Sequence, residues 1–176
     1  MTSLELHFLE NEGLTFNDFQ KQYLNDVSTK IQNQINTEGF KSLVTDFKHK
    51  IGRRWRPGFR LNKGMTNHEI FTLLMSGKDR YGGGDEVLNI HLKPYVKKLK
   101  IHATTFKDKR PVFLNTKYID YCMEKGEAKV PSMSGTLIHE YLHIMGFRHY
   151  TNRGKKRDKP TVPWGIGGIV KKLVGG

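Results

Sequence analysis

The stretch from His139 to His149 constrains the chain more than any other, because it reads H-E-x-x-H-x-x-G-x-x-H. On a helix, residues four apart lie on the same face, so His139 and His143 can direct two imidazoles at one ion, with Glu140 beside them. Gly146 permits the positive φ that ends a helix and turns the chain back, and this turn can deliver His149 as a third ligand. A catalytic zinc is bound by three such side chains and keeps one position open. The sequence therefore predicts an open three-histidine zinc site.

This stretch resembles the zinc-binding signature of the metzincin metallopeptidases, in which the same eleven-residue pattern is followed by a turn containing methionine. The sequence departs from that pattern in one respect, since it has no methionine after Met145. The resemblance implies an α+β fold of the zincin type, with a small mixed sheet, packed helices and an active-site helix at about residues 133–145. It also implies a single catalytic domain over residues 1–176, with an upper subdomain at about 1–146 and a short C-terminal lower subdomain at about 147–176.

The activity implied by the resemblance is that of a zinc-dependent endopeptidase with one catalytic Zn²⁺ ion, bound by His139, His143 and His149. Glu140 is expected to act as the general base, which takes a proton from the attacking water and passes it to the departing amine. The substrate is then a protein or peptide. A tyrosine assists the oxyanion in some metzincins, and Tyr150 is left unassigned in that role.

Two other functions stay open from the sequence. One is a basic nucleic-acid-binding protein with a structural zinc, and the other is a zincin-fold protein that binds metal without catalysis. Glu140 argues against the first, because a structural site is usually closed by four ligands and needs no base. It argues against the second as well, although the missing methionine turn leaves room for that alternative.

Length and charge set broader limits. A chain of 176 residues, 36% of them hydrophobic, can form one domain with a substantial core. Its net charge of +13 attracts nucleic acid and other polyanions without choosing among them. No apolar run is long enough to span a membrane, and the N-terminus does not read as a secretory signal. The compartment is not predicted, secretion of a processed form stays compatible with the sequence, and a monomer is expected.

Cys122 is the single cysteine, so an internal disulfide is excluded. It could in principle serve as a fourth metal ligand, but its position well before the metal motif favours a small buried hydrophobe.

Hydrophobic spacing predicts two helices before the metal motif. Apolar residues recur at intervals of three or four over residues 16–35, with Thr15 as the expected cap and an end near Gly39. The tetrad Thr66–Glu69 forms a capping box and predicts a second helix, which Gly77 closes.

Alternating apolar residues predict strands near residues 4–8, 87–92, 99–103 and 112–115. In zincins one strand at the sheet's edge borders the active-site cleft, where unpaired backbone groups can capture an extended peptide. Residues 112–118 are the expected edge segment, because they are the last strand-like residues before the metal helix.

The segment from Lys48 to His68 holds seven cations and no acidic residue. Its arginines alternate with Trp55 and Phe59, a composition that can stack on and neutralise single-stranded nucleic acid. The favoured alternative is a solvated basic loop whose two aromatic side chains reach back into the core.

Three further expectations concern the chain around the motif. Ser132 or Ser134 is expected to cap the metal helix at its N-terminus. Residues 153–159 are expected to form an exposed basic loop. Residues 162–165, Val-Pro-Trp-Gly, are expected to form a tight turn that either supports the metal in place of the methionine turn or packs Trp164 into the core.

Overall fold

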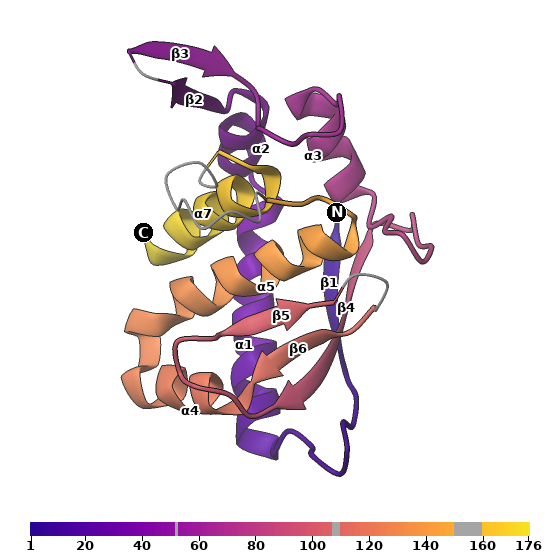
Figure 1. The fold of residues 1–176 in the computed structure, drawn as a ribbon, viewed down its shortest axis with the longest axis vertical. Helices are drawn as coiled ribbons and strands as arrows, with labels where there is room; N and C mark the ends of the chain where they lie inside the picture. The colour runs from indigo at the N-terminus through magenta and orange to yellow at the C-terminus, as the bar shows by residue number, and fades with distance from the viewer. Residues whose placement is uncertain (52, 107–109, 150–159) are drawn as a thin grey trace.

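The computed structural model describes residues 1–51, 53–106, 110–149 and 160–176 (Figure 1). Its elements in chain order are β1 (Ser3–Phe8), α1 (Asp18–Ile35), α2 (Glu38–Thr45), β2 (Lys48–Ile51), β3 (Arg54–Pro57), α3 (Asn67–Met75), β4 (Val87–Tyr95), β5 (Ala103–Thr105), β6 (Val112–Asn115), α4 (Thr116–Lys125), the 3₁₀ helix η1 (Gly126–Lys129), α5 (Val130–Ile144) and α7 (Val162–Gly175). The predicted α+β class, with a small mixed sheet and packed helices, is confirmed.

Four strands form the main sheet in the order β1-β4-β6-β5. The pairs β1–β4 and β4–β6 are parallel, whereas β5 runs antiparallel to β6. Along β4 the buried residues Leu88, Ile90 and Leu92 alternate with half-buried ones. Side chains on a strand point alternately to the two faces of the sheet, so the described helices cover one face only.

The edge strand beside the metal helix is β5, not the segment predicted. Residues 112–115 form β6, which is paired on both sides, and the chain then enters α4, a helix that the sequence analysis did not predict. The buried side chain of Asn115 stabilises the position of this short edge strand. Its Nδ2 donates to the carbonyl of Ile101 at 2.7 Å, and so fixes the chain that leads into β5. The strand predicted at 99–103 lies instead at Ala103–Thr105, and the two ranges share only residue 103.

Helix α1 supplies much of the core. Its predicted stripe is confirmed for Val27, Ile31 and Ile35, which are buried together with Leu24. The stripe was also expected to include Phe19, and this is wrong, since 79% of Phe19 is exposed. The predicted cap at Thr15 is wrong. The cap lies two residues later, at Asn17, which forms a capping box with Gln20. The chain then turns after Ile35 and starts α2, capped by Thr37, where the sequence analysis expected only an end near Gly39. The predicted α3 is confirmed, with its capping box at Thr66–Glu69.

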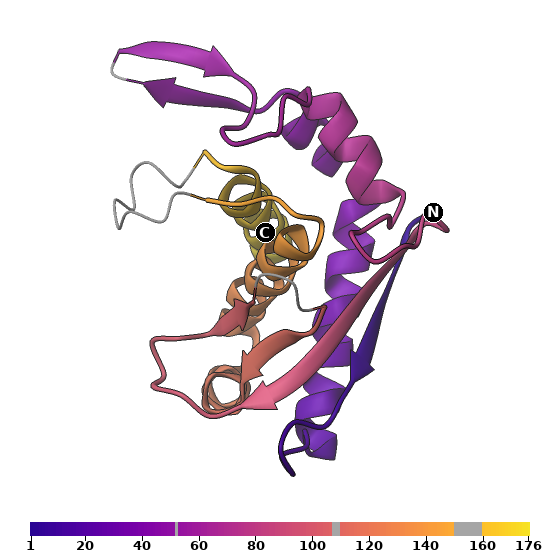
Figure 2. The ribbon, with the colours of Figure 1, turned by 45° about the vertical axis from the view of Figure 1, so that its right-hand side comes forward.

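The basic segment is not a loop, because β2 and β3 pair into an antiparallel hairpin. In both ribbon views this hairpin extends away from the rest of the molecule (Figures 1 and 2). Phe59 is buried and stacks on Phe47, as the loop interpretation expected for it. Trp55 behaves otherwise, since 66% of it is exposed.

Helices α5 and α7 lie side by side (Figures 1 and 2). Their backbones approach closely where Gly135 meets Gly167. A Cβ on Gly135 would lie 2.8 Å from the carbonyl oxygen of Gly167, and a Cβ on Gly167 would lie 2.8 Å from the oxygen of Gly135. Only glycine permits so close a backbone approach at this point. The apolar side of α7 belongs to the same hydrophobic cluster as α1, α2 and α5. The proposed division into subdomains at residue 146 stays a prediction.

Within the described residues, no helix combines the length and hydropathy that a membrane crossing requires.

Candidate metal centre

The central helix of the site is α5, which carries two of the three predicted ligands. It runs from Val130 to Ile144, slightly earlier than the predicted 133–145. Neither Ser132 nor Ser134 caps it, since both lie inside the helix and no side chain makes the cap. Ser134 donates instead to the carbonyl of Val130, four residues back. The serines are of the residue type that caps a helix but are not in the cap position, because the helix has already begun at Val130, with Pro131 in its first turn.

The turn after α5 brings back His149, the third predicted ligand. Gly146 has φ +88°, and the amide of Phe147 donates to the carbonyl of Leu142 at 3.0 Å. This backbone hydrogen bond closes the helix and reverses the chain. The reversal brings His149 back beside the two histidines of α5.

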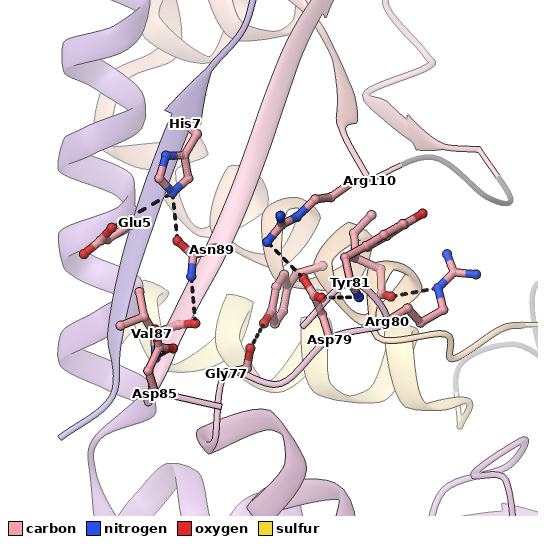
Figure 3. A network of polar contacts seen from close by, with 12 residues as sticks. Glu5, His7, Gly77, Asp79, Arg80, Tyr81, Asp85, Val87, Asn89 and Arg110 are labelled. Carbon is pink, nitrogen blue, oxygen red and sulfur yellow. Dashed lines mark hydrogen bonds and ion pairs between the residues drawn. The ribbon is translucent and has the colours of Figure 1, made fainter. Parts of the chain in front are cut away.

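Two basic side chains hold this turn from outside. Arg80 Nε donates to the carbonyl of Ile144 at 3.0 Å, and Lys63 Nζ donates to that of Met145 at 3.2 Å. Cations at a helix C-terminus are stabilised by its free carbonyls and by the helix dipole. Figure 3 shows Arg80 directed toward the end of α5, next to the ion pair of Asp79 with Arg110. Neither basic side chain was predicted, because residues 63 and 80 lie far from the motif in sequence.

The three predicted ligands meet at one point. One candidate ligand atom from each of His139, His143 and His149 lies within 4.8 Å of the other two, and no other group of this kind occurs in the described part of the chain. The Nε2 atoms of His139 and His143 are 3.2 Å apart. Two nitrogens bound to a tetrahedral zinc at about 2.0–2.1 Å would lie about 3.3 Å apart. The donor set and this spacing therefore fit zinc.

Each of the two histidines on α5 is oriented by a backbone carbonyl. His143 Nδ1 lies 2.8 Å from the carbonyl oxygen of Phe147, and His139 hydrogen-bonds the carbonyl of Pro163. A ring nitrogen that donates to a carbonyl leaves the other nitrogen free to bind metal. Burial lowers the pKa of His139 to about 3 and that of His143 to about 4. Both imidazoles are therefore neutral at pH 7, which is the form that binds zinc.

Residues 162–165 form the first turn of α7 rather than the tight turn predicted. Pro163 lies in the first turn of a helix, where a proline is well tolerated. Trp164 is half-exposed and is not packed into the core. Its ring lies edge-on to that of His139, with the centroids 4.7 Å apart. The segment thus borders the metal ligands, through the Pro163 carbonyl and the Trp164 ring.

Glu140 lies beside the histidines and is 8% exposed. Burial raises the pKa of its carboxyl group to about 7, from an ordinary value of 4.5. Thr105, on edge strand β5, donates a hydrogen bond to Glu140 Oε2. Sequence reasoning missed Thr105, although it ends the short strand that borders α5.

Two hollows flank the histidines and share Ala103, Glu140 and His149. The larger has a volume of about 620 Å³ and lies toward Trp164 and Lys171 on α7. The smaller, of about 410 Å³, lies toward Arg80 and Arg148 and is bordered by His143. Edge strand β5 contributes to both hollows. Together they form an open cleft along β5 with the three histidines at its middle.

Several other sequence predictions are resolved or left outside the structure. Cys122 is buried and free, which confirms its interpretation as a small hydrophobe, and it does not belong to the histidine group. Tyr150 and the basic loop at 153–159 lie outside the described residues.

Comparisons of this chain with protein-family models, with curated proteins and with solved structures gave no match.

Proposed function

We propose that the protein is a zinc-dependent endopeptidase of the zincin type, with His139, His143 and His149 as ligands and Glu140 as general base. The single observation that carries this proposal is the place of Glu140. It lies next to the three histidines, and it borders both hollows of the cleft. A carboxylate needed only for structure has no reason to occupy that position.

Bound zinc would act as a Lewis acid, lowering the pKa of a water molecule and polarising the substrate carbonyl. Glu140 would receive the proton of the attacking water and later give it to the departing amine. Its burial beside the three histidines supports this role, because the carboxyl group is held next to the site of the attacking water and away from bulk solvent. The hydrogen bond from Thr105 would hold the carboxylate in one orientation.

The proposed substrate is an extended peptide segment. Strand β5 is paired only with β6, so one side of its backbone is available to an added strand. The cleft that follows β5 extends to both sides of the histidines, as cleavage within a chain rather than at its end requires.

The experiment is digestion of an unstructured protein such as casein by the purified protein. Mass spectrometry of the products identifies the peptide bonds that are cleaved. We expect internal cleavage that stops when a chelator removes the metal and returns when stoichiometric zinc is added. His143→Ala serves as the control, because it removes a ligand and leaves Glu140 in place. Cleavage that continues with the chelator, or with His143→Ala, would contradict the proposal. Zinc binding without any hydrolysis would favour the inactive zincin-fold alternative.

A further inference from the structure

The β2–β3 hairpin contributes little to the folded core, and this sets it apart from the other strands. It forms a two-stranded sheet of its own, and each of its five cations (Lys48, Lys50, Arg53, Arg54 and Arg56) is exposed. An isolated two-stranded hairpin is only marginally stable in water. The chain nevertheless keeps an exposed tryptophan on it, an arrangement that folding does not explain.

The charge of the hairpin is all of one sign. The residues from Lys48 to Pro57 include no acidic side chain. Within the described part of the chain, none of the five cations forms an ion pair. Their exposure leaves these cations accessible to an external anion.

The strand register places an aromatic ring among some of these cations. Lys50 lies directly opposite Trp55, and Lys48 lies opposite Pro57. Residues opposite each other in an antiparallel pair share a face, and residues two apart on a strand do so as well. One face of the hairpin thus carries Trp55 with two ammonium groups, about 6.7 Å apart along β2. Arg54 and Arg56 lie on the other face.

We propose that this hairpin binds single-stranded nucleic acid, with Trp55 stacking on a base and Lys48 and Lys50 neutralising neighbouring phosphates. Aromatic rings beside cations bind single strands without sequence preference, because every base has a face on which to stack. A duplex keeps its base faces stacked and would leave Trp55 unused. A lipid surface fits less well, since the cations lie on both faces and no apolar face remains to enter a bilayer.

The binding is measured by the fluorescence anisotropy of a labelled oligothymidine, titrated with the full-length protein at several salt concentrations. Trp55→Ala is expected to weaken binding roughly 5- to 150-fold, the usual effect of removing one stacking ring. The double variant Lys48→Ala/Lys50→Ala is expected to reduce the slope of log K against log salt by about 1.4, since each phosphate contact on a single strand contributes about 0.7.

The matched control is Lys117→Ala/Lys172→Ala, which removes the same net charge from exposed sites outside the hairpin. If this control weakens binding as much as the hairpin double variant, net charge alone is responsible and the proposal fails. Equal affinity for duplex and single strand, or an unchanged affinity in Trp55→Ala, would also overturn it. Vesicles containing phosphatidylserine test the lipid alternative, and loss of vesicle binding in Trp55→Ala with oligothymidine binding intact would assign the hairpin to membranes instead.

This site is independent of the metal centre. Glu140→Gln is therefore expected to bind oligothymidine like the wild type, whatever its effect on hydrolysis. Retained zinc content in the hairpin variants shows that they are folded.

Discussion

Replacing Gly167 by alanine tests whether the contact between α5 and α7 positions the metal ligands. A Cβ at residue 167 would lie 2.8 Å from the carbonyl oxygen of Gly135 and 3.3 Å from the Cβ of His139. The first of these neighbours is backbone and cannot rotate away. The two helices must therefore separate by several tenths of an ångström, and His139 must move with them.

The matched control is Gly168→Ala, one residue further along the same helix. Its Cβ would meet nothing within 4 Å. Alanine is favoured over glycine inside a helix by about 1 kcal/mol, so this variant should be more stable than the wild type. For a chain of this size, that gain corresponds to a rise of about 2–4 °C in Tm.

Gly167→Ala receives the same helix propensity but also suffers the overlap. Inserting atoms into a close-packed contact costs about 1–3 kcal/mol, so we expect a net loss of about 0–2 kcal/mol. Because the strain reaches His139, the affinity for zinc should fall as well. Thermal unfolding of the metal-free proteins and a zinc titration with a competing chelator measure the two effects. This reasoning would be refuted if Gly167→Ala raised the Tm as much as Gly168→Ala does and left the affinity for zinc unchanged.

Three further predictions concern the site. His149→Ala should weaken zinc binding by orders of magnitude while α5 stays folded, and unchanged affinity would reduce the site to two histidines. Gly146→Ala should lower both Tm and zinc affinity, because its φ of +88° is strained for alanine and its Cβ would lie 2.7 Å from Lys63 Nζ. Burial raises the pKa of Glu140 from 4.5 to about 7 in the folded protein, so folding is opposed once the pH is high enough to ionise this group. Between pH 4.5 and pH 8, the free energy of unfolding of the metal-free wild type should therefore fall by about 3 kcal/mol more than that of Glu140→Gln. Urea unfolding at the two pH values measures that difference, and equal losses would contradict the burial of an ionisable carboxylate.

The cluster of three histidines was largely predictable because its geometry is local. The spacing of His139 and His143 follows from the period of a helix, and the return of His149 follows from the conformation that Gly146 allows. The neighbours of these residues were not predictable in the same way. Thr105 and Arg80 reach the site through tertiary contacts between segments that are distant in sequence.

The prediction of the edge strand was wrong for a related reason. Residues 112–115, Val-Phe-Leu-Asn, form a short apolar stretch, whereas residues 103–105 read Ala-Thr-Thr, and neither pattern tells an edge strand from a central one. The pairing is decided by β4, which is parallel to β6, and by Asn115, which fixes the chain before β5. The basic hairpin was not predicted because Lys, Arg and His dominate its sequence. A strand is recognised by apolar residues that alternate on a buried face, and all four residues of β3 are exposed.

The most direct test of the proposed function is the activity of zinc-loaded Glu140→Gln. Glu140 does not belong to the group of three histidines that could hold a metal ion. The variant should therefore retain one zinc per chain, as measured by inductively coupled plasma mass spectrometry. Its rate of peptide hydrolysis should nevertheless fall by about 10²–10⁴-fold, the usual effect of losing a positioned acid–base group. Zinc retained with hydrolysis at the wild-type rate would leave the proposed mechanism without its base and contradict it.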